Sequence, residues 1–205
     1  QHSTVNAMRM DFLYKIPTKS TKELCRLAGY LASDGNIGKY RFGFINTHKE
    51  LVDDFEYCVS KITDFPAKKK SYIATKHTGK VIYETSYTRS FITRILNGIG
   101  ILPGIDKTKT VPEFVLKSPK EGVVAYIKAV LECDGSISPR SVRLKMASKD
   151  IVTKIDLMMQ NLGIYGNLHT PRFDGTKTPM WRWVCHDSEA IKKFFDIFGE
   201  FYSIR

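Results

Sequence analysis

The stretch LAGYLASDG (Leu27–Gly35) returns in altered form as IKAVLECDG (Ile127–Gly135), one hundred residues further along the chain. Each stretch is an apolar run with helical spacing that ends in Asp-Gly. The sequence therefore predicts two equivalent helices, with Asp34 and Asp134 at their C-terminal ends.

Both ends of these helices carry local signals. Ser20 and Ser118 each stand three residues before a glutamate, which predicts a capping box with the serine as N-cap. Gly35 and Gly135 stand where a helix end favours a glycine in the left-handed conformation.

The same offset continues downstream, so the chain is expected to be two copies of one unit. Each copy reads as helix, strand, helix, further strands and a closing helix. The expected strands are residues 41–46, 71–75 and 81–88, then 141–146, 167–172 and 180–185. The helices between and after them begin near residues 50 and 90, then 150 and 188. We expect a first repeat over residues 1–99 (with 1–10 a tag or flexible extension), a linker over 100–117, and a second repeat over 118–205.

The composition favours a polyanionic partner. The chain has 205 residues, with 32 Lys plus Arg against 21 Asp plus Glu, which gives a net charge of +11. Such a surplus attracts nucleic acid first and an anionic membrane surface second. No stretch approaches the about 18 apolar residues of a membrane span. The four cysteines form no CxxC pair, and no export signal opens the chain, so we expect an intracellular protein without structural zinc or disulfides.

The placement of the two aspartates is electrostatically unfavourable, because a helix C-terminus carries partial negative charge. Asp-Gly is also a common turn, and that alternative stands for either helix taken alone. Small residues on one face of each helix (Cys25, Gly29 and Ala32; Ala125 and Ala129) would let the two helices pack closely. That packing would place both carboxylates side by side, and paired carboxylates without His or Cys favour Mg²⁺.

At this point the sequence resembles a known family. LAGYLASDG is similar to the LAGLIDADG motif of homing endonucleases, and residues 127–135 resemble a weaker second copy with Ala129 in place of the usual glycine. The resemblance covers essentially the whole chain and is to the monomeric, two-motif members. It implies an α+β fold of two pseudo-symmetric αββαββα repeats, each with a curved antiparallel sheet that contributes to a DNA-binding saddle. The strand that completes each repeat is expected near residues 36–39 and 136–139.

The resemblance also implies an activity: cleavage of double-stranded DNA at a long, asymmetric target with two or three Mg²⁺ ions, for which Mn²⁺ would substitute. Asp34 and Asp134 would bind the metal, with the main-chain oxygens of Ser33 and Cys133 as additional ligands. Asn46 would contact the water network at the site, although the second copy has Met146 there. A catalytic lysine is expected in the linker, with Lys109 as first choice and Lys107 as second; a solvated basic loop is the alternative.

Strand alternation predicts which side chains face DNA. On one parity Tyr40, Phe42, Phe44, Val142, Leu144 and Met146 should face the helices. The other parity presents Lys39, Arg41, Gly43, Ser141, Arg143 and Lys145 outward, and Arg41 and Arg143 are the candidates for bidentate contacts to guanine. Phosphate or flanking contacts are expected from Lys68, Lys69, Lys70, His169, Arg172 and Arg182.

Two binding functions remain as alternatives to a nuclease on the same fold: an RNA-binding intron maturase, and a DNA-binding protein without catalytic activity. The presence of both motif aspartates favours the nuclease. Expected partners are double-stranded DNA and, for a maturase, intron RNA, without a membrane. The expected state is a monomer in the cytoplasm or an organelle.

Overall fold

The computed structural model describes residues 18–73, 79–172 and 178–202. The first repeat contains α1 (Lys22–Ala32), β1 (Gly35–Ile37), β2 (Phe42–Asn46), α2 (Lys49–Ser60), β3 (Lys68–Ile73), β4 (Val81–Tyr87) and α3 (Ser90–Gly98). After a short helix α4 (Glu113–Leu116), the second contains α5 (Lys120–Asp134), β5 (Gly135–Ser138), β6 (Ser141–Met146), α6 (Lys149–Asn161), β7 (Asn167–Arg172), β8 (Met180–Cys185) and α7 (Ser188–Phe198). Residues 1–10, expected to be an extension, lie outside the described part.

Each repeat forms its own four-stranded antiparallel sheet. The strand orders are β1-β2-β4-β3 and β5-β6-β8-β7, so the two sheets have the same topology. The predicted α+β fold of two pseudo-symmetric repeats is confirmed. Two details differ: β3 begins at Lys68 rather than residue 71, and the expected linker contains α4. Residues 74 and 75 of the expected strand 71–75 lie outside the described part. Among the described helices, none has both the length and the apolar character needed to cross a bilayer.

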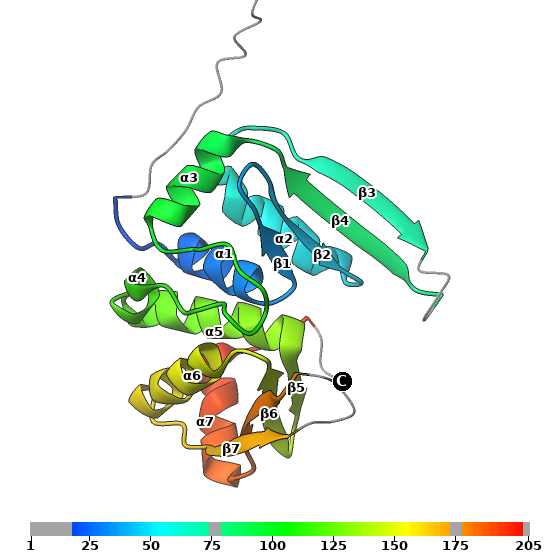
Figure 1. Cartoon of the computed structure of the whole chain (residues 1–205). Helices are drawn as coiled ribbons and strands as arrows, with labels where there is room; N and C mark the ends of the chain where they lie inside the picture. The colour runs from blue at the N-terminus through cyan, green and yellow to red at the C-terminus, as the bar shows by residue number, and fades with distance from the viewer. Residues whose placement is uncertain (1–17, 74–78, 173–177, 203–205) are drawn as a thin grey trace, which may run out of the picture.

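The helices α1 and α5 lie side by side between the two halves (Figure 1). Their contact depends on the small residues that the sequence offers there. A Cβ on Gly29 would come within 2.6 Å of the Tyr126 carbonyl oxygen and 2.8 Å of the Ala129 Cβ. The absence of a side chain at position 29 therefore sets the distance between the halves.

The helix ends differ from the prediction. Thr21, not Ser20, is the N-cap of α1, and its hydroxyl accepts from the Leu24 amide at 3.2 Å. Pro119 precedes α5, while the Ser118 hydroxyl donates to the Phe114 carbonyl at 2.7 Å instead of capping.

The motif glycines also serve a different purpose from the one predicted. Gly135 has φ −84°, and Gly35 does not have a positive φ either. A Cβ at these positions would meet the preceding helix, at 2.6 Å from the Leu31 Cα and 2.4 Å from the Leu131 oxygen. Glycine is needed here because the first strand of each sheet starts directly against the helix that precedes it.

The core of each half lies between its sheet and its helices. Phe42 and Phe44 pack with Phe55 and Tyr87 in the first half, and Trp183 is fully buried in the second. The predicted inward parity holds for Phe42, Phe44, Val142, Leu144 and Met146. It is wrong for Tyr40, which is 55% exposed because it precedes β2 and so escapes the strand's alternation.

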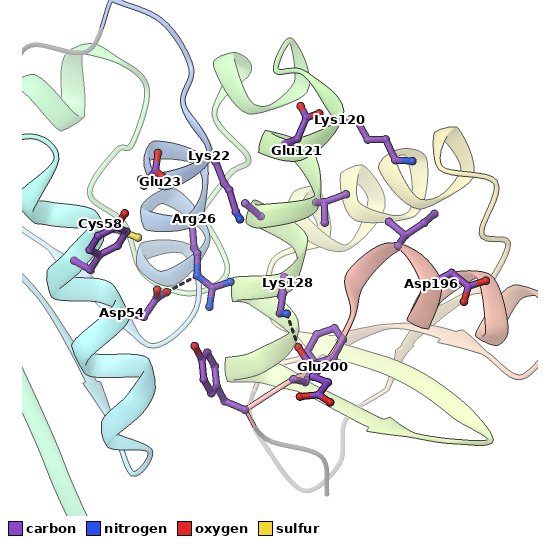
Figure 2. A pocket seen from close by; sticks show the side chains of 16 residues that line it. Lys22, Glu23, Arg26, Asp54, Cys58, Lys120, Glu121, Lys128, Asp196 and Glu200 are labelled. Atoms are coloured by element: carbon purple, nitrogen blue, oxygen red, sulfur yellow. Dashed lines mark hydrogen bonds and ion pairs between the residues drawn. The ribbon is translucent and has the colours of Figure 1, made fainter.

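A buried ion pair joins the two halves. Arg26 on α1 donates to Glu132 on α5 at 2.7 Å, and it also pairs with Asp54 on α2. The Tyr30 hydroxyl donates to the same Asp54 carboxylate at 2.7 Å. Figure 2 shows Arg26 directed towards Asp54 at the junction of the halves. The charges stabilise the fold only as a complete set, since each would be costly if buried alone.

Replacing Gly29 with valine should destabilise the protein by about 1–3 kcal/mol, because the added side chain would force α1 away from the Tyr126 backbone. Urea denaturation measures the change. Gly98→Ala is the matched control, since a Cβ there meets nothing within 4 Å. A Gly29 variant as stable as the control would show that the contact between the halves is not tightly packed.

Candidate active site

The two motif aspartates line one hollow of about 510 Å³. Asp34 follows the end of α1 and Asp134 is the last residue of α5, so the packing of these helices brings the carboxylates of the two halves together. Asp34 is exposed and Asp134 is half-buried. The sequence predicted this meeting of the halves, and the described structure has it.

The electrostatics agree with close carboxylates. The pKa of Asp34 is raised because neighbouring atoms displace water, and the hydrogen bond from Asn46 partly offsets this. Burial raises the pKa of Asp134 to about 7, and the negative charge of Asp34 contributes to the rise. A divalent cation between them would relieve both effects.

Asn46 and Met146 occupy equivalent places but differ in chemistry. The Asn46 amide donates to Asp34 at 2.8 Å, and its oxygen accepts from the His48 backbone amide at 2.9 Å, which fixes the orientation of the side chain. Met146 is buried and offers no such bond. The surroundings of the two carboxylates are therefore unequal.

His48 belongs to the same region, although sequence reasoning found no role for it. It lines a smaller hollow of about 250 Å³ with Asp34 and Asn46. The signal available in the sequence was its place two residues after Asn46, at the start of the helix that follows the strand.

Lys109 comes to the site from the segment between the repeats. Its ammonium group donates to the carbonyls of Ser33 at 2.8 Å and Gly35 at 3.1 Å, just past the negative end of α1. Its own carbonyl accepts from the Ser148 hydroxyl at 2.7 Å, so Lys109 connects the first half to the second. Lys107, the second choice, is exposed and lines the carboxylate hollow.

The residues present fit a hard cation held partly by a substrate. Among the described residues, no three His, Cys, Asp or Glu side chains converge in a group that could hold a metal. Two carboxylates do suffice for Mg²⁺ when phosphate oxygens and water complete the shell. The buried Ser33 hydroxyl lies near Asp134 and lowers its pKa. This hydroxyl makes no hydrogen bond to a described residue, so it could still bind a ligand at the site. The Ser33 carbonyl already accepts from Lys109, and nothing distinguishes the Cys133 carbonyl as a ligand.

The sheet positions predicted to face outward divide into two groups. Lys39, Lys68, Lys70, Arg143, Lys145 and His169 are exposed, and Arg182 is half-buried on β8. Two positions correct the prediction: Gly43 is buried against Thr85 and Ser86, and Ser141 is buried with its hydroxyl 3.1 Å from that of Ser138. Arg172 ends β7, but its side chain lies outside the described part of the chain.

Ion pairs also involve two of the predicted basic residues of the first half. Arg41 pairs with Glu84 on β4. The alternation within one strand could not predict this pair, because the two residues belong to different segments of the chain. Lys69 pairs at 2.5 Å with Glu56 on α2, so it points away from the outward face.

A larger hollow, of about 830 Å³, lies elsewhere. It is lined by the first turns of α1 and α5 and by the segment after α7, where Lys128 donates to the carbonyl of Glu200 (Figure 2). The aspartates are at the opposite ends of these helices, so this hollow is not the carboxylate site.

The raised pKa of Asp134 predicts a pH-dependent stability in the absence of metal. Between about pH 4 and pH 7 the folded chain holds a proton that the unfolded chain releases, so stability should fall as pH rises. At pH 8 the cost of the ionised carboxylate is fully present, and Asp134→Asn should stabilise the protein by about 1–3 kcal/mol. Urea denaturation in EDTA at pH 5 and pH 8 measures this. Equal effects of the substitution at both pH values would contradict the raised pKa of Asp134.

The sequence is similar to those of known proteins. The sequence profile of the LAGLIDADG-like domain matches residues 121–199. The chain is 25% identical over 172 residues to the DNA polymerase of Thermococcus kodakarensis, and 24% identical over 181 residues to the replication factor C small subunit of Methanocaldococcus jannaschii. These matches cover 78% and 87% of this chain but 9% of each relative, so the chain spans about a tenth of their length.

Solved structures share the fold. Mesophilic variants of the homing endonuclease I-DmoI match with a TM-score of 0.63 and 13% identity, covering 87% of this chain and 96% of theirs. The complex of I-DmoI with DNA and Mn matches with a TM-score of 0.60 and 13% identity, covering 87% and 97%. Full-length DUF199/WhiA from Thermatoga maritima matches with a TM-score of 0.58 and 8% identity, covering 89% and 57%.

Proposed function

We propose that the chain is a two-motif LAGLIDADG protein and a site-specific endonuclease that uses Mg²⁺ to cut both strands of a long, asymmetric DNA target. The observation that carries the proposal is the pair of carboxylates, one from each half, that line a single hollow at the ends of α1 and α5. Because one chain supplies both, a monomer would be sufficient.

Similar proteins support the choice of DNA and of a divalent metal. I-DmoI, which has this fold, has been solved with DNA and Mn, with DNA and Ca, and with its target DNA in the presence of Mg. The net charge of +11 and the exposed basic residues on the sheets suit the same partner. We propose residues up to 99 and from 118 onward as the two DNA-binding halves, joined by the segment that carries Lys109.

The chain's own residues would have separate tasks. Asp34 and Asp134 would hold the metal, which when bound lowers the pKa of its water and stabilises charge on the oxygens that attack and leave. Asn46 would keep the Asp34 carboxylate oriented through its 2.8 Å hydrogen bond. Lys109 would keep a positive charge beside the scissile phosphate while it fixes the ends of the two halves relative to each other.

The test is incubation of the whole chain with Mg²⁺ and a randomised duplex library, followed by sequencing of the ends. We expect paired cuts at one long sequence, no cuts in EDTA, cuts with Mn²⁺, and binding that weakens steeply with salt. Binding to duplex DNA without cuts would reject the endonuclease and support a DNA-binding protein without catalytic activity on the same fold. Preference for structured RNA over duplex DNA would support the RNA-binding intron maturase instead.

A further inference from the structure

We propose that the two sheets divide the work of recognition. The second sheet, through Arg143, reads base identity, while the first sheet holds its half of the target mainly by the phosphates. This inference rests on the proposed function and specifies how the substrate would be selected. It follows from a difference between the sheets that the repeat in the sequence conceals.

The outward arginine of the first sheet is already engaged. Arg41 pairs with Glu84, whose side chain is only 13% exposed and lies on the central strand β4. Glu84 also stands directly opposite Lys70 in the register of β3 and β4, so a second cation lies on the strand beside the same carboxylate. One terminal nitrogen of Arg41, whose side chain is 49% exposed, makes this ion pair, so Glu84 competes with a base edge for the guanidinium.

Other positions of this face add little base-reading chemistry. Position 43 is a glycine, and on the same parity the inner strands β2 and β4 offer Ile45, Ile82 and the buried Ser86. The exposed polar side chains of this parity, Asn36 and Tyr72, lie on the edge strands β1 and β3. The exposed lysines Lys68 and Lys70 are on the edge strand β3, at the margin of the sheet. Lysines at such a margin suit phosphate contacts, which give affinity without sequence information.

The second sheet has the opposite character. Within their bounds, the strands β5–β8 contain no Asp or Glu. Arg143 is exposed on the central strand β6, between Ser136 and Val184 in the register, and it makes no ion pair with the described residues.

Its neighbours form a hollow of matching chemistry. Arg143, Asn167, His169 and Arg182 line a hollow of about 440 Å³ that extends as far as Asp134. A guanidinium at the centre of such a surface is suited to the O6 and N7 acceptors of guanine in the major groove, and Asn167 and His169 beside it can donate or accept further hydrogen bonds.

The test is a binding measurement in magnesium-free buffer, with duplexes selected from a randomised library and every base pair then changed singly. We expect base changes to weaken binding by about 10–100-fold in one half of the target and by less than about threefold in the other. Arg143→Ala should remove the preference at one position in the first of these halves. Arg41→Ala, the matched control, should leave all base preferences unchanged and reduce affinity only slightly.

A second substitution tests whether a base preference can be created in the other half of the target. Glu84→Gln should release Arg41, because a neutral amide holds a guanidinium less tightly, and should create a new base preference in the other half. Adding Arg41→Ala should abolish that new preference. Equal base preferences in both halves, or an Arg41→Ala effect as large as that of Arg143→Ala, would overturn the division of work while leaving the endonuclease proposal intact. Absence of any duplex binding would overturn both.

Discussion

Asp34→Asn and Asp134→Asn should each reduce DNA cleavage by about a thousandfold or more while leaving target binding within a few-fold of the unmodified chain. An amide keeps the shape of the carboxylate but loses the charge that would hold the metal. Binding should persist because the sheet faces remain intact. Single-turnover cleavage and filter binding, measured on the same duplex, separate the two effects.

The control for this pair is Asp53→Asn, which removes an exposed carboxylate that pairs with Lys49 on α2, away from the hollow. It should change neither cleavage nor binding. Full cleavage by either motif variant would reject the carboxylate pair as the catalytic centre. Loss of binding together with cleavage would mean that the substitution disturbs the fold instead.

Arg26→Ala should destabilise the chain by about 3–5 kcal/mol, the largest effect on stability that we expect from a single substitution outside the apolar core. The change would leave Asp54 and the fully buried Glu132 without their shared cation. It would also remove a direct link between the halves. The midpoint of urea denaturation measures the loss.

Lys49→Ala removes one partner of a pair whose side chains are both more than half exposed, and it should change stability by less than about 1 kcal/mol. The combined replacement of Arg26 by methionine, Asp54 by asparagine and Glu132 by leucine should recover much of the loss, because no uncompensated charge would remain buried. An Arg26→Ala variant as stable as Lys49→Ala would show that water reaches the network.

Periodicity and repetition determined most of the architecture from the sequence. The one-hundred-residue offset, the apolar faces and the Asp-Gly ends predicted both repeats, and the small residues on one face of each motif helix predicted the contact of α1 with α5. These features are local or repeated, so each can be read from a short window of residues. Lys109 and Asn46 came from the family resemblance; the structure brings both to the carboxylates, while their catalytic roles stay predictions.

Tertiary structure alone decided what depends on neighbours distant in the chain. Glu84 lies 43 residues from Arg41, yet its charge engages that arginine. Glu132 lies 106 residues from Arg26, and the pair became visible only when the two halves met. The motif glycines were identified correctly but explained wrongly, since their purpose is close approach to a helix rather than a left-handed turn. Sequence pattern thus determined which faces are apolar and where the carboxylates lie. Which charges pair with each other was decided by the tertiary structure, because Coulomb energy depends on the distance between groups and not on their separation along the chain.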